Sequence, residues 1–276
     1  MRSKYLKNRF NTSKEELQRL GNEFTHNALS LLDKLYNLTF WILLDIKSTE
    51  KIIQQVFKEA IEDCDITKNE ADWQSWIERI WMREILEYYS EKENDRNTDF
   101  SFIENFDADI DTAQTVLSSD STSKKIIVLL QKLPAVLRIP LMMREIAQFN
   151  YEKISDLIDV PVGVAATRIH RARKLLFLFF LENFDYESEK KNWSDTKSSK
   201  SIFELRKCSL LVDDELTDTE KVNFDVLKKN SIIMETELFI QCEIKKWLLT
   251  LTKLPFDAHS IKRKITKKAL KKFNVS

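Results

Sequence analysis

The sequence predicts an all-α protein, and three observations carry this prediction. Only two glycines and four prolines occur in 276 residues, so the residues that tight turns between strands require are scarce. Apolar residues recur at three- and four-residue spacing over long stretches. Hydrophobic residues make up 43% and charged residues 32% of the chain, which is typical of globular proteins. The length predicts two or three modules of roughly 100 residues each.

The first predicted domain, residues 1–90, is a bundle of about four helices. Its apolar residues keep helical spacing from Glu15 to about Tyr89, as in the run Leu29, Leu32, Leu35, Tyr36, Phe40, Trp41 and Leu44. Residues 91–120 then gather carboxylates, with Glu104, Asp107, Asp109 and Asp111 close together. Since few opposing charges accompany them, we expect an acidic linker here.

Two further helical domains are predicted after this linker. Residues 121–182 regain helical periodicity, which Pro134, Pro140 and Pro161 break where helices begin, bend or end. A polar linker, residues 183–201, follows. The last segment, residues 202–276, ends in the basic stretch IKRKITKKALKKF, which fits either nucleic acid, an acidic surface or a solvated helix without a partner.

A helix-turn-helix is predicted inside residues 121–182. Asn150 is placed to cap a short helix over residues 151–158. Pro161 and Gly163 then break the pattern, and we expect Gly163 to supply the backbone angles of the turn. A second helix, from about Val164 to Phe177, has an apolar face at Ile169, Ala172, Leu175 and Leu176. Its basic residues are expected to project outward, as a DNA recognition helix requires: Arg168, Arg171, Arg173 and Lys174.

Several function classes are disfavoured by composition. The net charge of zero gives no overall attraction to nucleic acid, so DNA binding must come from local basic clusters. Two isolated glycines cannot form a glycine-rich phosphate loop. No residues are spaced for nucleophile activation or metal binding, so we expect neither an enzyme nor a cofactor nor a metal. Three distant cysteines indicate the cytoplasm, and no apolar run approaches a membrane span.

The stretch YEKISDLIDVPVGVAATRIHRARKLL, preceded by Leu133-Pro134 and Arg138, resembles region four of the extracytoplasmic function (ECF) group of sigma-70 family factors. That family has LP, then R, a tyrosine-led EIA helix and a PVGTVKSRIHRARK run. Val164, Ala165 and Ala166 depart from the family's Thr, Val and Lys, and Ser155 and Asp156 from the Ile and Ala of its EIA helix. The resemblance implies DNA contacts by Thr167, Arg168, His170, Arg171, Arg173 and Lys174.

The first domain is similar to region two of the same factors. Thr49 to Phe57 aligns with the family's AEDLVQETF-like helix, and Trp76 to Ile80 with its W-L-x-x-I element. The resemblance implies polymerase contact by Ile53, Gln54 and Phe57, and promoter melting by Trp76, Arg79, Arg83, Tyr88 and Tyr89. Lys51 and Arg83 depart from the family pattern. Without the resemblance, Trp73, Trp76 and Trp81 favour core packing over base stacking.

The last segment has a shorter resemblance of its own. Leu210 to Leu216, LLVDDEL, is similar to the YLDGEL element of zinc-binding anti-sigma domains, with an unrelated helical extension as the alternative. The family's zinc ligands would fall on Leu227, Ser231 and Met234, which cannot bind zinc as thiolates or imidazoles do. The resemblance implies a zinc-less, fused anti-sigma-like segment that docks on the sigma domains.

Two functions follow from these resemblances. The first is a cytoplasmic sigma factor that binds core RNA polymerase and promoter DNA and is inhibited by its own C-terminal segment. The second is a helix-turn-helix regulator that binds DNA and no longer engages polymerase. Retention of core polymerase separates the two.

Overall fold

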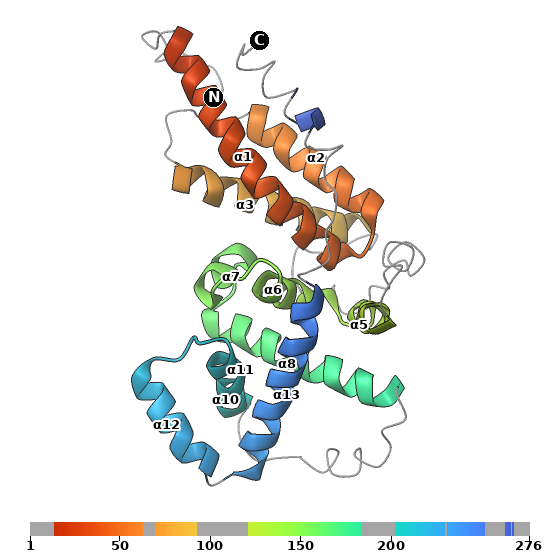
Figure 1. Ribbon diagram of the computed structural model, residues 1–276, viewed down its shortest axis with the longest axis vertical. Helices are drawn as coiled ribbons and strands as arrows, with labels where there is room; N and C mark the ends of the chain where they lie inside the picture. The colour runs from red at the N-terminus through yellow and green to blue at the C-terminus, as the bar shows by residue number, and fades with distance from the viewer. Residues whose placement is uncertain are drawn as a thin grey trace. The chain divides into compact units, whose positions relative to one another are not determined.

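The structure, a computed structural model, describes residues 14–62, 70–92, 121–183, 202–229, 231–251, 263–265 and 267. Throughout these ranges every regular element is a helix and no strand occurs (Figure 1). The predicted all-α class is therefore confirmed. The two predicted linkers, residues 91–120 and 183–201, lie almost entirely outside the described residues. None of the helices within the described ranges is both long and apolar enough to cross a bilayer.

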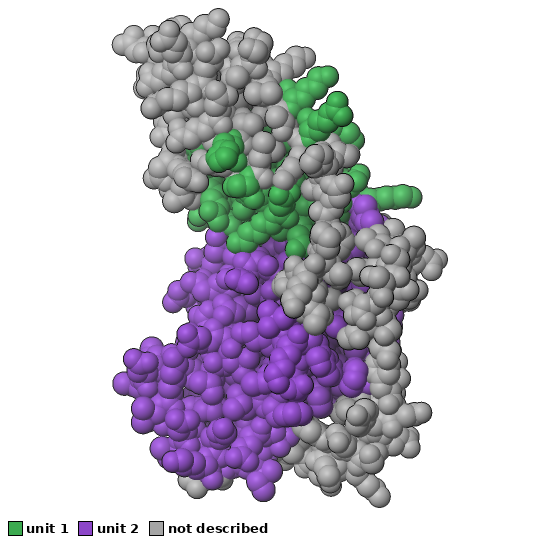
Figure 2. All heavy atoms as spheres, viewed as in Figure 1, with its two compact units in different colours: residues 1–37, 47–88, 256–276 green, residues 38–46, 89–255 purple. Residues whose placement is uncertain are grey.

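The chain forms two compact units, which are coloured separately in Figure 2. Unit 1 takes residues 1–37, 47–88 and 256–276, and unit 2 takes residues 38–46 and 89–255. The end of the first helix therefore belongs to unit 2, together with the whole of residues 121–251. Each unit is described by itself below.

Unit 1 is built from most of α1 (Lys14–Leu43), α2 (Ile46–Glu62) and α3 (Glu70–Lys92). Within residues 14–92 the structure describes three helices where the periodicity predicts about four. The buried side chains of α2 follow helical spacing: Thr49, Ile52, Ile53, Val56, Phe57, Ala60 and Ile61. Trp73 and Trp81 of α3 are buried as well, as core packing predicts, while Trp76 is half-buried.

Unit 2 is arranged around one long helix. Its elements are α5 (Ser121–Gln131), α6 (Ala135–Glu145), α7 (Tyr151–Ile158), α8 (Val162–Asn183), α10 (Ile202–Leu205), α11 (Lys207–Val212), α12 (Asp218–Lys229) and α13 (Ile232–Leu251). Helix α8 packs against α6 and α7 and also against α11 and α13 (Figure 1). The predicted helix-turn-helix and helices α10 to α13 thus share one compact unit, whereas residues 256–276 of the predicted last segment are assigned to unit 1.

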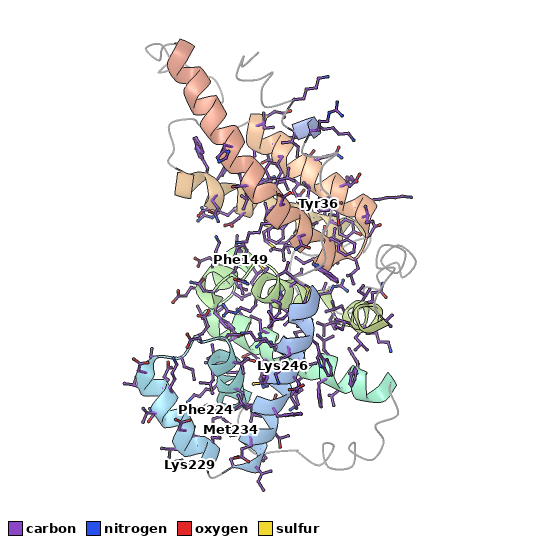
Figure 3. The ribbon with its side chains drawn as sticks, viewed as in Figure 1. Tyr36, Phe149, Phe224, Lys229, Met234 and Lys246 are labelled. Atoms are coloured by element: carbon purple, nitrogen blue, oxygen red, sulfur yellow. The ribbon has the colours of Figure 1, made fainter. Side chains whose placement is uncertain are left out.

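Helices α10 to α13, here called the C-terminal segment (residues 202–251), have an apolar core of their own. Phe224 of α12 and Met234 of α13 are fully buried in it (Figure 3), together with Leu205, Cys208 and Leu216. Met234, one of the three positions aligned with zinc ligands, is therefore a packing residue. Because the segment buries apolar surface among its own helices, part of its stability does not depend on α8.

Candidate nucleic-acid interface

The first helix of the motif begins as the sequence predicts. The side-chain Oδ1 of Asn150 accepts a hydrogen bond from the backbone N–H of Lys153 at 2.9 Å, so Asn150 is the N-cap of α7. The helix ends at Asp159, which has φ 50° and ψ 54°, and its N–H donates to the carbonyl of Ser155. The Ser155 hydroxyl donates to the carbonyl of Val160 and closes the turn. Asp tolerates this left-handed conformation better than most residues.

Gly163 does not supply the turn geometry, and that prediction is wrong. It has no positive φ and lies in the first turn of α8, which begins one residue earlier. Instead, the guanidinium of Arg206 approaches it closely, and Nη1 donates to the Gly163 carbonyl at 2.9 Å. A Cβ at this position would lie 2.5 Å from the same nitrogen. The glycine therefore matters through its small size beside the C-terminal segment.

Helix α8 has three faces. Of the predicted apolar face, Ile169, Ala172 and Leu176 are buried and Leu175 is half-buried, and Ala165 extends the buried face at the same spacing. A second stripe contacts the C-terminal segment and follows the same spacing: His170, Arg173, Lys174 and Phe177. Arg171 is exposed on the third face. The segment thus covers one of the two faces that the domain core leaves open.

Arg173 is at the centre of a buried cluster of charges. It donates from Nε to Oε1 of Glu145 at 2.9 Å and from Nη2 to Oδ1 of Asp213 at 2.8 Å, and its own side chain is 0% exposed. Tyr151 Oη donates to the other Asp213 oxygen at 2.6 Å, and Lys245 Nζ donates to Oδ1 at 2.8 Å. One carboxylate from the C-terminal segment therefore binds side chains of both α7 and α8.

Burial and charge act in opposite directions on the acids of this cluster. Desolvation raises the pKa of Asp213, but the Arg173 charge and the hydrogen bonds from Arg173, Lys245 and Tyr151 outweigh it and lower that pKa to about 2. For Glu145, desolvation dominates and the pKa is raised. Burial, and then the Asp213 charge, raise the pKa of Tyr151 well above its ordinary value. Asp213 is therefore the carboxylate that this site holds ionised most firmly.

A second acidic side chain, Glu237 of α13, meets the same stripe of α8. Its Oε1 lies 2.9 Å from Nε2 of His170, and its Oε2 accepts from Nζ of Lys174 at 2.9 Å. Gln241, one turn further along α13, donates to Glu237 and to the His170 carbonyl. Desolvation raises the pKa of Glu237, but the hydrogen bond and charge of His170 and the charge of Lys174 lower it to about 2.

The stripe ends in an aromatic cluster. The ring of Phe177 stacks on Trp247 of α13, with ring centroids 6.2 Å apart, and meets Phe239 edge to face. Phe180 approaches Trp247 more closely, at 4.3 Å between centroids. The contact between α8 and α13 is therefore polar near His170 and apolar beyond it.

The predicted DNA-contacting residues divide among these faces. Arg173 does not project outward as expected, because Glu145 and Asp213 draw it inward, and His170 is only 1% exposed. Thr167 is half-buried and donates to the Gly163 carbonyl, and Arg168 is half-buried too. Lys174 is partly exposed beside Glu237, whereas Arg171 is exposed to solvent. DNA contact by these six side chains stays a prediction.

The predicted polymerase contacts lie on α2. Ile53 and Phe57 are fully buried in unit 1, so their side chains support the helix from inside, and Gln54 is half-buried. Of the predicted promoter-melting residues, Arg79 is exposed, while Trp76 and Tyr88 are half-buried. These roles are also left as predictions.

Tyr89 lies in a buried hydrogen-bonded group. Its hydroxyl donates to the Ile42 carbonyl and accepts from Nη2 of Arg138, both at 3.2 Å. Arg138 also donates to the Leu130 carbonyl at 2.9 Å. The arginine after Leu133-Pro134 thus fixes the end of α5 against α6, and Tyr89 is placed away from solvent at 2% exposure.

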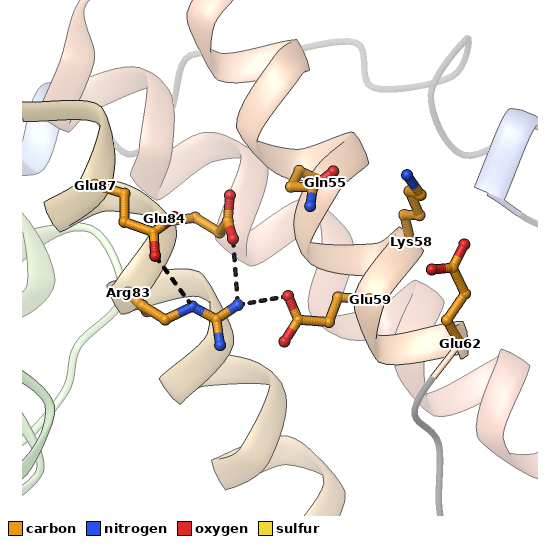
Figure 4. A pocket seen from close by; sticks show the side chains of 7 residues that line it. All are labelled: Gln55, Lys58, Glu59, Glu62, Arg83, Glu84 and Glu87. Atoms are coloured by element: carbon orange, nitrogen blue, oxygen red, sulfur yellow. Dashed lines mark hydrogen bonds and ion pairs between the residues drawn. The ribbon is translucent and has the colours of Figure 1, made fainter. Parts of the chain in front are cut away.

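Arg83 belongs to a shallow acidic pocket between α2 and α3, with a volume of about 580 Å³ (Figure 4). Its guanidinium hydrogen-bonds to Glu59 and Glu84 and lies 3.7 Å from Glu87. The hydrogen bond to Glu59 is the main cause of its raised pKa. Arg83, which the family resemblance assigns to contact with single-stranded DNA, is therefore paired with three glutamates.

Comparison with known proteins identifies part of unit 2. Residues 123–176 match the family model described as Sigma-70, region 4. These residues form a sigma-70 region 4 domain. Over 133 residues, 45% of this chain and 70% of the relative, the chain is 26% identical to the ECF RNA polymerase sigma-E factor of Haemophilus influenzae. The corresponding factors of Escherichia coli K12 and Salmonella typhimurium LT2 are 24% identical over the same shares.

These similarities are distant, and they support a relation between this chain and the ECF group of the sigma-70 family. No solved structure matches the chain. The resemblance of the C-terminal segment to an anti-sigma domain stays a prediction.

The acidic residues that meet the region 4 domain were not predicted from the sequence. Asp213 lies within the LLVDDEL stretch, which was singled out only for its likeness to anti-sigma domains, and Glu237 carries no motif. One signal was available. Residues 170, 173, 174 and 177 share a helix face that the apolar core does not use, and such a face accepts a partner helix.

Proposed function

We propose that this protein is an ECF-type sigma factor that binds core RNA polymerase and directs promoter recognition. The match of residues 123–176 to sigma-70 region 4 is the observation that carries this proposal. In the proposed division of the chain, residues 1–90 serve as region two, residues 121–182 as region four and residues 202–276 as a regulatory extension. The factor acts in the cytoplasm and performs no covalent chemistry of its own.

Promoter DNA is proposed to bind α8 of the region 4 domain. Arg171 and Lys174 face solvent wholly or in part, and Thr167 lies on the same side of the helix. Arginine and lysine can bind phosphates, and arginine can also read base edges in the major groove. Ala166 supplies no cation where the family has lysine, so we expect weaker or different sequence preference.

The C-terminal segment is proposed to inhibit the factor from within the chain, by limiting both its access to core polymerase and its binding to promoter DNA. It covers the stripe of α8 that holds His170 and Arg173, and its Arg206 covers the start of the helix at Gly163. The contact combines ion pairs with the aromatic cluster around Trp247. Because the segment has an apolar core of its own, it can separate from α8 as a folded body. Tethering keeps its effective concentration near the millimolar range.

Transcription with purified core polymerase tests the function directly. The full chain should give promoter-dependent transcripts only weakly, and a chain ending near Glu182 should give more of them. Deleting residues 201–276 should also strengthen binding to core polymerase. Unchanged polymerase binding would remove the proposed inhibition of polymerase access while leaving the sigma function itself in place.

A second candidate is a helix-turn-helix regulator that binds DNA without polymerase. The contacts of Arg83 with Glu59, Glu84 and Glu87 favour it, because three carboxylates beside this guanidinium offset its charge and repel the phosphates of a DNA strand. Co-purification decides between the candidates. Retention of core polymerase by the tagged chain that ends near Glu182 supports the sigma factor, and DNA binding by that chain without polymerase supports the regulator.

A further inference from the structure

The carboxylate of Asp213 fills a position where donors from three helices of the region 4 domain meet, α6, α7 and α8. Tyr151 of α7 donates to Oδ2 at 2.6 Å, and Arg173 of α8 donates to Oδ1 at 2.8 Å. Arg144 of α6 lies 3.6 Å from Oδ1 through Nε and donates from Nη2 to the Asp213 carbonyl. These donors come from sequence positions 29 residues apart at most, and the acceptor comes from the C-terminal segment.

The position is built to hold an anion. Arg173 is 0% exposed and Tyr151 is 1% exposed, so both donors are fixed by the surrounding packing. Within the region 4 domain, Glu145 balances only one of the two guanidinium charges that approach Asp213. The other charges here, Glu215 on Arg144 and Lys245 on Asp213, belong to the C-terminal segment and would leave with it. The pKa of Asp213 is lowered to about 2 despite its burial, first by Arg173 and then by hydrogen bonds from Lys245 and Tyr151. Arg173 and Tyr151, the two of these groups that belong to the region 4 domain, therefore favour a negative charge at this position.

We propose that Tyr151, Arg173 and Arg144 form an anion site that Asp213 occupies in the closed protein and that a DNA backbone phosphate occupies once the C-terminal segment leaves. The proposal rests on the proposed function, because it requires the segment and DNA to compete for the region 4 domain. A phosphate offers the same charge and acceptor oxygens as the carboxylate, and phosphate contacts from several helices fix the orientation of a helix-turn-helix on the duplex. Asp213 thus acts as a mimic of the ligand it excludes.

The site predicts that removing the Tyr151 hydroxyl will have opposite effects in closed and open protein. In the wild-type chain, Tyr151→Phe removes a hydrogen bond to Asp213, so the segment is held less tightly and DNA affinity should rise. In an opened chain, the same change removes a hydrogen bond to DNA. Affinity should then fall roughly 2- to 10-fold, the worth of one hydrogen bond. A merely structural tyrosine would not reverse the sign.

The opened chain is made by Glu237→Lys, which places a cation beside Lys174 and His170 but leaves the anion site intact. Its matched control is Glu243→Lys, the same charge change on the same helix at a residue paired with Lys246. All variants are made in the full chain and checked by circular dichroism and thermal unfolding. Affinity is measured by fluorescence anisotropy with a short random-sequence duplex, because phosphate contacts do not depend on base sequence.

Glu237→Lys should raise DNA affinity roughly tenfold over the Glu243→Lys control, since it breaks a largely buried pair. Adding Arg144→Gln to the opened chain should lower the slope of log affinity against log salt by about one, as the loss of one phosphate contact requires. Equal effects of Tyr151→Phe in both backgrounds would overturn the anion site while leaving the competition with the segment intact.

A different result would show that the proposed function fails. If Glu237→Lys binds DNA no better than its control, the segment does not compete with DNA. In that case the segment does not hinder DNA, so Tyr151→Phe can be tested in the wild-type chain itself. If this variant binds DNA as tightly as the wild type, the anion site is overturned as well. In a further arm, inorganic phosphate is added at matched ionic strength. Stabilisation of the opened chain that Tyr151→Phe abolishes, with DNA affinity unchanged, would assign the site to free phosphate and overturn the DNA assignment.

Discussion

Arg83 and Arg173 each bind several carboxylates, but only one of them lies in the protein interior. Arg83 in unit 1 contacts Glu59, Glu84 and Glu87 with 47% of its side chain exposed (Figure 4). Arg173 in unit 2 contacts Glu145 and Asp213 with none of it exposed. The ion pairs are chemically alike, and the surrounding solvent differs.

This difference decides how much each group contributes. Water screens the Arg83 pairs, and holding long side chains in one geometry costs entropy, so exposed pairs contribute little. Around Arg173 the charges have lost their water, so each depends on the others for compensation. Counting ion pairs would rank Arg83 first, whereas burial makes the Arg173 cluster the one that determines structure.

The largest expected effect comes from breaking the buried cluster. Arg173→Met should destabilise unit 2 by roughly 3 to 5 kcal/mol, because Glu145 and Asp213 would remain buried without their shared cation. Urea denaturation followed by circular dichroism measures this change. A loss below about 1 kcal/mol, the range of surface pairs, would contradict the comparison.

Asp213→Asn should have a smaller effect that depends on pH. The pKa of Asp213 in the folded protein is about 2, below its ordinary value of 3.8. A lowered pKa contributes stability that is present above pH 4 and is lost as the pH falls toward 2. The free energy of unfolding of the wild type should therefore exceed that of the variant by about 2 kcal/mol at pH 7, and this difference should disappear toward pH 2. Urea denaturation at several pH values measures it. A constant gap from pH 7 to pH 3 would argue against this role.

Arg83→Gln tests the exposed member of the comparison. The loss of its three partners should cost less than about 1 kcal/mol, and moderate salt should remove most of that difference. Thermal unfolding at low and high salt provides the measurement. A large loss that salt leaves unchanged would show that the Arg83 group resembles the buried one after all.

Gly163→Ala should change stability the least. It extends the comparison to a third arginine, Arg206, whose guanidinium contacts Gly163. Alanine favours the helix by up to about 1 kcal/mol, but its Cβ displaces Arg206 from the Gly163 carbonyl, at a similar cost. The net change in stability should be near zero. In an Arg206→Ala background the gain from alanine should appear alone. If Gly163→Ala destabilises both the wild type and the Arg206→Ala variant, the backbone conformation at this position requires glycine after all.

Much of the fold could be predicted from local sequence. Helical spacing of apolar residues locates the helices of residues 121–183, and Asn150 caps α7 as expected because an Asx side chain can reach its own helix start. The region 4 resemblance agrees with the family match to residues 123–176. These features depend on residues near one another in the chain.

The rest depends on contacts that sequence spacing does not record. Arg173 was expected to face solvent because it is basic and lies off the apolar stripe, yet its partner Asp213 is 40 residues away. The turn was assigned to Gly163 because glycine reaches positive φ most easily, but Asp159 adopts that conformation. A basic residue on a helix face indicates a polar partner there and leaves its identity open.

The position of Cys208 has a consequence for the chemistry of the C-terminal segment. Its thiol lies in the segment's apolar core, and burial raises its pKa to about 12. Oxidants and alkylating agents react with the thiolate, of which about one part in 10⁵ is present at pH 7 with such a pKa. Peroxide at neutral pH should therefore leave this thiol unmodified while the segment stays folded.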